Sequence, residues 1–166
     1  MHDDLWTRAR RAPGAALPLS VVFEHWPAVR EALRAALRGL DDASFVVLGE
    51  PAPPVSPRRR LLSRRSRPAP TRYVQVLRVV DFLSAECVGP TALGGAWDMS
   101  EGTIQVLREL GWRTPEERAE EFGTSTPNLD VVVEMSEVEG VGDLMVATLQ
   151  LLGARPGDLV LETSAG

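Results

Sequence analysis

The sequence predicts an α+β sandwich, a single domain in which an antiparallel sheet packs against helices. Its 166 residues suit one hydrophobic core, because a chain of this size buries roughly 70% of its unfolded surface on folding. Apolar residues recur at helical spacing in some segments and form β-branched or alternating runs in others. The resulting order is helix, three strands, helix, strand, helix and a final strand, without an internal repeat.

The first predicted helix covers residues 27–40. Pro27 suits a first helical turn, and Gly39 is a suitable C-terminal stop. Three apolar residues recur on one face of this helix: Val29, Leu33 and Leu37. The next run, residues 43–50, is rich in β-branched side chains and ends near Gly49, so it predicts the first strand.

Four later segments have the composition of strands. Residues 72–80 and 82–89 predict a strand pair, although the turn between them lacks the usual glycine or asparagine. Residues 128–136 predict a half-buried antiparallel strand, because two sets of side chains alternate along it. The apolar set is Leu129, Val131, Val133 and Met135, and the opposite set is Asp130, Val132, Glu134 and Ser136. Residues 158–162 predict an edge strand.

The central predicted helix covers residues 100–110. Asp98 or Ser100 can cap its first free amides, and Gly111 ends it. The spacing predicts a buried side made of Ile104, Leu107 and Leu110.

A short acidic turn and a last helix complete the predicted domain. Thr114 and Glu117 form a capping box that opens the turn, which stops at Gly123. The last helix covers residues 139–153. It places six residues together on its buried side: Val141, Leu144, Met145, Thr148, Leu149 and Leu152.

Two segments differ in composition from these elements. Residues 1–19 lack a sustained period and contain several helix breakers, so we interpret them as a loosely ordered N-terminal arm. Residues 51–70 contain 6 of the 13 prolines and 6 of the 18 basic residues, all arginine, so we expect a flexible insert there. The rest of the chain, residues 20–166, is predicted to form one domain around this insert.

The insert contains a basic loop made of Arg58, Arg59, Arg60, Arg64, Arg65 and Arg67. Ser63 and Ser66 follow arginines closely and are candidate phosphorylation sites. Residues 1–78 hold 14 arginines against 7 acids, whereas residues 79–166 hold 4 against 16, so the second half would repel phosphates. Binding of a nucleic acid or another anionic surface through the basic loop is therefore the alternative function. Alternatively, these arginines belong to a solvated insert that has no function.

The residue types do not predict catalysis, a metal site or a cofactor. Cys87 lies within a predicted strand and His25 precedes a helix, so we interpret them as a buried thiol and a helix-entry residue. One cysteine and two histidines are too few for a cluster of metal ligands. We interpret the glutamates of the acidic turn, Glu116, Glu117, Glu120 and Glu121, as a solvated face. The sequence contains no phosphate-binding or dinucleotide motif.

A cytoplasmic location is expected. The first residues carry acids where a secretory signal has a basic region followed by a long apolar one. A single cysteine cannot form an internal disulfide, which agrees with a reducing compartment. No apolar run approaches the roughly 20 residues that a membrane span needs.

Tyr73, Trp97 and Trp112 are the candidate partner-binding residues. Tyrosine and tryptophan are enriched in recognition hot spots, but in a small domain they also serve as core residues. Trp112 directly follows Gly111 and is expected to fold back onto the core. Trp97 lies in a predicted loop, outside the periodic apolar face, and is the better docking candidate.

The segments YVQVLRVVDFLSAECVG, LRELGW and PNLDVVVEM, with the final apolar helix, resemble the bacterial YbjN-like, type III secretion chaperone-like family of TY-Chap domains. The resemblance covers roughly residues 20–162 and matches the predicted element order. It implies a secretion-chaperone-like α+β fold, commonly dimeric, that holds an extended segment or exposed patch of another protein without chemistry. The expected function is thus a chaperone-like or adaptor role toward a protein client.

Overall fold

The computed structural model describes residues 22–51 and 70–164. Its helices are α2 (Trp26–Arg38), α4 (Glu101–Glu109), α5 (Pro115–Phe122) and α6 (Val138–Leu151). Its strands are β1 (Phe45–Gly49), β2 (Tyr73–Val79), β3 (Phe82–Cys87), β4 (Leu129–Glu134) and β5 (Val160–Ser164). This order confirms the predicted α+β class, and the acidic turn is the eight-residue helix α5. The N-terminal arm, the basic loop and its two candidate phosphorylation sites lie outside the described residues.

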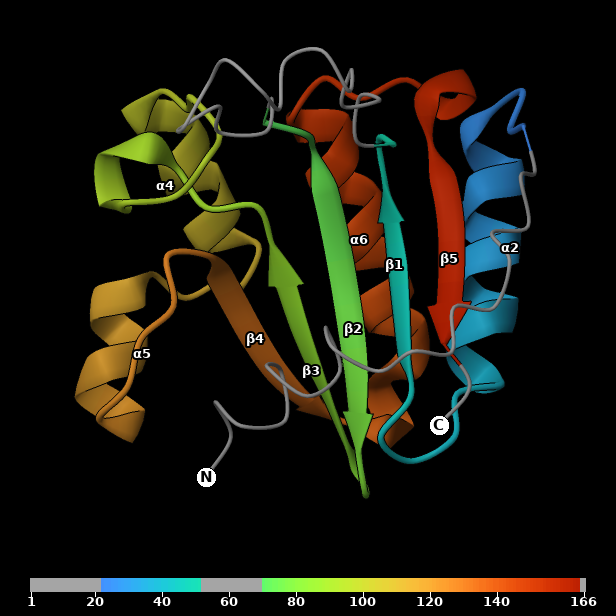
Figure 1. Ribbon diagram of the computed structural model, residues 1–166, viewed down its shortest axis with the longest axis horizontal. Coiled ribbons are helices and arrows are strands. Elements are labelled where there is room, and N and C mark those ends of the chain that lie inside the picture. The colour runs from blue at the N-terminus through green and yellow to red at the C-terminus, as the bar shows by residue number, and fades with distance from the viewer. Residues whose placement is uncertain (1–21, 52–69, 165–166) are drawn as a thin grey trace, which may run out of the picture.

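The strands form one antiparallel sheet in the order β4-β3-β2-β1-β5, so β5 is an edge strand as predicted. In Figure 1, α6 crosses behind β1 and β2, α2 lies next to β5, and α4 and α5 lie beyond β4. Within the described part of the chain, no helix covers the sheet face that is turned toward the viewer. This uncovered side is termed the open face below.

The core lies between the sheet and the helices α2 and α6. Alternate residues of each strand point toward these helices. The buried strand residues on that side are Val46, Leu48, Val74, Val76, Leu83, Ala85, Cys87 and Leu129. The predicted apolar faces of both helices are confirmed, since Val29, Leu33 and Leu37 of α2 and Val141, Met145 and Leu149 of α6 are buried.

Side-chain caps fix the beginnings of three helices. His25 caps α2, which confirms it as a helix-entry residue. Ser100, rather than Asp98, caps α4. The capping box predicted from Thr114 and Glu117 is present at α5. Each cap satisfies backbone N–H groups that the first turn of a helix leaves without a partner.

The turn between β2 and β3 contains no standard turn motif in its sequence and is held by side-chain hydrogen bonds. Val80 has a φ of 55°, which a β-branched residue rarely adopts. Its N–H donates to Asp42 Oδ1 at 2.6 Å, and Arg78 Nε donates to its carbonyl at 3.1 Å. Residues before and within the hairpin therefore stabilise a tight turn that lacks glycine.

The predicted burial of Leu110 is wrong, since this side chain is 41% exposed. Helical residues are about 100° apart, so Leu110 lies about 120° around the axis from Ile104. In addition, α4 ends at Glu109. Leu107 is buried and Ile104 is partly buried, so the core side of this helix is narrower than predicted.

The alternation predicted for β4 places Asp130 on the side opposite the core, as the structure has it, but its side chain is buried instead of exposed to solvent. Its Oδ2 atom accepts from Arg113 Nη2 at 2.9 Å and from Arg118 Nη1 at 2.5 Å. Two arginines from the region of α5 thus cover Asp130 at the β4 edge of the sheet. A pattern confined to one strand does not reveal such a cover.

Candidate functional site

The open face of the sheet carries apolar side chains beside carboxylates. Strand alternation and register place these residues on it: Phe45, Val47, Gly49, Tyr73, Gln75, Leu77, Phe82, Ser84, Glu86, Asp130, Val132, Glu134, Val160, Glu162 and Ser164. Phe82 is 49% exposed and Val132 is 43% exposed. Large apolar side chains that remain exposed on one face are typical of a binding surface.

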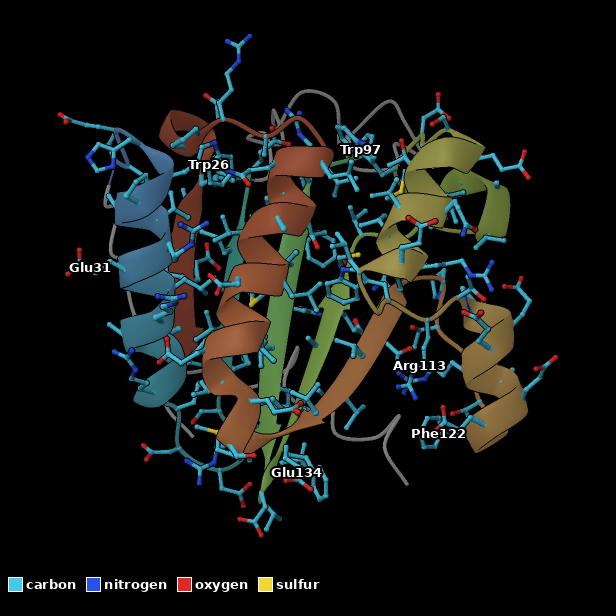
Figure 2. The ribbon with its side chains drawn as sticks, turned by 180° about the vertical axis from the view of Figure 1, so that it is seen from behind. Trp26, Glu31, Trp97, Arg113, Phe122 and Glu134 are labelled. Carbon is cyan, nitrogen blue, oxygen red and sulfur yellow. The ribbon has the colours of Figure 1, made fainter. Side chains whose placement is uncertain are left out.

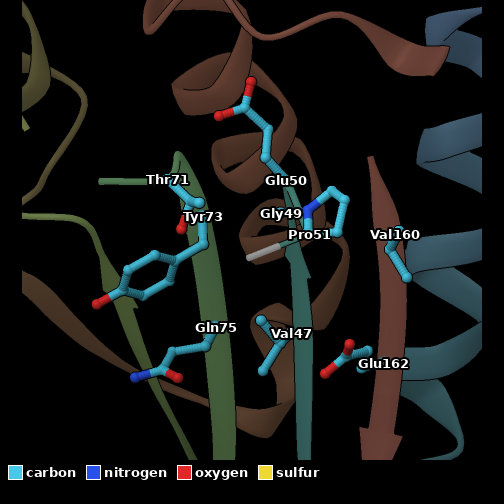
Figure 3. A pocket seen from close by; sticks show the side chains of 9 residues that line it. All are labelled: Val47, Gly49, Glu50, Pro51, Thr71, Tyr73, Gln75, Val160 and Glu162. Carbon is cyan, nitrogen blue, oxygen red and sulfur yellow. The ribbon is translucent and has the colours of Figure 1, made fainter. Parts of the chain in front are cut away.

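A hollow of about 330 Å³ lies at one end of the open face, where Gly49 separates Tyr73 from Val160 (Figure 3). Gln75 and Glu162 form its next row. A side chain at position 49 does not fit, because a Cβ there would lie 2.6 Å from the Cβ of Tyr73. Gly49 therefore permits the close approach of β2 and leaves the space open.

A buried carboxylate occupies the middle of the open face. Glu86 lies between Gln75 of β2 and Asp130 of β4 in the strand register and is 1% exposed. Its Oε2 atom accepts from Gln75 Nε2 at 2.8 Å and from Asn128 Nδ2 at 3.2 Å. Asn128 Nδ2 also donates to Tyr73 Oη at 2.9 Å. This network links the wall of the hollow to the centre of the sheet.

The β4 edge of the open face is closed by charge pairs. A backbone bridge places Arg113 beside Asp130, with Arg113 N donating to Asp130 O at 2.8 Å. Arg113 Nη1 reaches Glu121 of α5 at 2.6 Å, and its guanidinium stacks over the Phe122 ring at 4.9 Å from the centroid. Figure 2 shows Arg113 and Phe122 side by side next to α5. These pairs hold α5 against the sheet edge.

An ion pair joins the two ends of the insert beside the hollow. Glu50 accepts from Arg72 N at 3.0 Å and from Arg72 Nε at 2.9 Å. Burial by itself raises the pKa of Glu50, but the hydrogen bonds and charge of Arg72 outweigh it and hold the pKa below its ordinary value. Arg72 Nη1 also donates to Gly153 O at 2.6 Å, and the guanidinium stacks over Trp97 at 5.0 Å from the ring centroid.

The loop that carries Trp97 is held by backbone contacts. The carbonyl of Gly89 accepts from Ala96 N and from Trp97 N, both at 3.0 Å. A Cβ on Gly95 would lie 2.1 Å from Gly89 O, so two backbone segments approach here more closely than any side chain permits. Trp97 is therefore fixed in place by its own loop as well as by Arg72.

The three predicted partner-binding residues are not brought together. Tyr73 lies on the open face, and Trp97 is half-buried near the C-terminal end of α6 (Figure 2). Trp112 is 2% exposed, and its Nε1 atom donates to Thr148 Oγ1 at 2.8 Å. The predicted core position of Trp112 is confirmed. Of the three, Tyr73 alone belongs to the open face.

The described residues show neither a reactive thiol nor a metal site. Cys87 is buried in β3, and burial, with the charges of Glu86 and Asp130, raises the pKa of its thiol above the ordinary value. A neutral, enclosed thiol is a poor nucleophile. In residues 22–51 and 70–164, no group of at least three His, Cys, Asp or Glu side chains could hold a metal ion. No helix in these stretches is long and apolar enough to cross a membrane.

Sequence reasoning did not assign Gly49 or Glu86 to a site. Glu86 is the one charge within the run FLSAECVG, and the neighbouring Ala85 and Cys87 face the core, so alternation could have placed it opposite the core. For Gly49, the sequence indicates only the end of a strand. Its role depends on the cross-strand neighbours Tyr73 and Val160.

The model of one protein family, TY-Chap3, matches residues 20–165. The family is described as "T3SS (YopN, CesT) and YbjN peptide-binding chaperone 3". The match runs from before α2 to beyond β5, and it confirms the resemblance seen in the sequence. No curated protein and no solved structure matches the chain.

Proposed function

This chain belongs to the TY-Chap3 family of peptide-binding chaperones, and we propose that it holds an extended segment of a client protein on the open face of its sheet. The role is binding without catalysis. The observation that carries the proposal is the sheet face without a covering helix in the described residues, which has the hollow at Gly49 toward one end and the exposed Phe82 and Val132 toward the other.

The open face offers two kinds of contact to an extended peptide. Phe82 and Val132 supply apolar area, and the hollow between Tyr73 and Val160 accepts a side chain. Side chains of an extended segment project to alternate sides, so every second one can reach the sheet. Aromatic and aliphatic anchors of this kind supply most of the binding energy in recognition sites.

The exposed apolar pair on the open face provides the test. We expect the double variant Phe82→Ser/Val132→Ser to bind a fluorescein-labelled probe peptide, about twelve residues of alternating valine and serine with one central arginine, roughly thirtyfold more weakly. This factor corresponds to about 2 kcal/mol of binding free energy, the contribution expected of apolar anchors. Fluorescence anisotropy measures the affinity.

The matched control is Leu151→Ser, which removes an exposed apolar side chain at the end of α6, outside the open face. It should leave the affinity unchanged. Equal weakening by both variants, with thermal unfolding showing both to be folded, would place the peptide elsewhere and remove the support for the open face.

We further propose that the chain forms a homodimer in the cytoplasm. The exposed apolar side chains of Val106, in α4, and Leu110, the residue directly after this helix, are four residues apart and away from the open face, and they support a second contact surface. The single, buried Cys87 supports a reducing compartment. Light scattering should give the mass of two chains, and the mass of one chain at micromolar concentration would rule out the dimer.

A further inference from the structure

Glu86 is a buried carboxylate without a cationic partner among the described residues. Its Oε2 atom accepts from two neutral amides, those of Gln75 and Asn128, whereas its Oε1 atom is buried and has no hydrogen-bond partner. Asp130, its neighbour on β4, is instead paired with two guanidinium groups. Burial of a carboxylate is costly unless its oxygens accept hydrogen bonds and a cation balances the charge.

A second oxygen without a donor lies on the adjacent strand. Asp130 uses Oδ2 for both arginines, and its Oδ1 atom is buried without a hydrogen-bond partner. Residues opposite each other on antiparallel strands have Cβ atoms about 5 Å apart. Glu86 and Asp130 form such a pair on the open face. The face therefore contains two neighbouring carboxylates, each with one unused acceptor.

The rest of the open face adds negative charge to this position. Glu134 and Glu162 lie on the same face, and neither forms an ion pair within the described residues. Arg113 and Arg118, whose guanidinium groups lie at the neighbouring Asp130, are already paired with that carboxylate. A cation that approaches the open face is thus attracted toward its centre.

We infer that the client segment places one cationic side chain, best an arginine, on Glu86. This inference rests on the proposed function. A guanidinium presents several donors in one plane, which suits the two unused oxygens of Glu86 and Asp130. The partly exposed side chain of Gln75 connects the hollow to Glu86, so the client reaches the carboxylate when that amide turns toward solvent.

The test compares three forms of the probe peptide, whose central residue is arginine, glutamine or glutamate. For the wild-type protein we expect the arginine form to bind at least about tenfold more tightly than the glutamine form, the scale of a charge-assisted hydrogen bond. In Glu86→Gln, which keeps the shape of the side chain, the arginine and glutamine forms of the peptide should bind equally. Glu134→Gln, the matched control, should retain the wild-type preference.

Each outcome decides between explanations. If the peptides bind without preference for arginine, ordered water satisfies Glu86 and the inference fails, while the proposed function stands. Equal loss of preference in Glu86→Gln and Glu134→Gln would indicate the general charge of the face and would also overturn the inference. If none of the peptides binds, the proposed function fails as well. Should Glu86→Gln not fold, the other variant decides: an arginine preference that the wild type shows and Glu134→Gln retains supports the inference, and its loss in Glu134→Gln overturns it.

The chain itself carries six arginines in its basic loop, and these are the competing occupant. Replacing all six by serine in the full-length chain should leave the affinity for the arginine peptide within about twofold. A clear gain of affinity in this variant would assign the Glu86 position to the basic loop and would contradict the assignment to a client.

Discussion

Gly89→Ala is expected to lower the free energy of unfolding by more than about 4 kcal/mol, an effect seen only for severe steric or core defects. A Cβ at this position would lie 1.7 Å from the carbonyl oxygen of Pro127, a backbone atom that cannot turn aside. The carbonyl of Gly89 also accepts the two hydrogen bonds that hold the loop of Trp97. Urea unfolding followed by circular dichroism measures the change.

Gly140→Ala is the matched control for this substitution. Gly140 lies in α6, and a Cβ there would meet nothing within 4 Å. Alanine is the better helix former, so this variant should gain about 0.5 to 1 kcal/mol. If Gly89→Ala were as stable as the wild type, the packing of the segment after β3 against Pro127 would be wrong.

Trp112→Ala is expected to cost about 3 to 5 kcal/mol of stability, as for other aromatic side chains removed from a core. The ring is enclosed beside α6, and its N–H donates to Thr148. Trp112→Phe keeps most of the ring and loses the hydrogen bond, so about 1 kcal/mol is expected for it. Thermal and urea unfolding give both values.

Comparing Trp97→Ala with Trp112→Ala tests whether Trp97, unlike Trp112, lies outside the core. Trp97 is half-buried and stacks on Arg72, so its truncation should cost clearly less than that of Trp112. Equal losses for the two variants would show that both rings belong to the core. The docking role first considered for Trp97 would then have no support.

Sequence periodicity predicts the elements of this fold because each one buries a single face. The spacing of Val29, Leu33 and Leu37 depends on local helical geometry alone, and the structure confirms it. The burial of Asp130 depends on arginines that a different segment supplies, so alternation along β4 predicts the wrong environment. Local patterns succeed where the sheet or helix itself sets the direction of a side chain, and fail where a third element covers it.

The candidate site follows the same division. Composition directs attention to aromatic residues, but Trp112 is needed in the core and Trp97 packs with Arg72. The open face depends on which side of the sheet the helices cover, and the hollow depends on strand register at Gly49. Neither can be derived from residue types before the topology is known.

Site-specific photo-crosslinking tests the position of the client most directly. A benzoylphenylalanine in place of Glu162 lies on the open face beside the hollow, and one in place of Glu31 lies on the exposed side of α2. Figure 2 shows Glu31 pointing away from α2 on the helical side of the molecule. We expect the probe peptide to crosslink to position 162 and not to position 31. Crosslinking at position 31 with none at position 162 would contradict a client held on the open face.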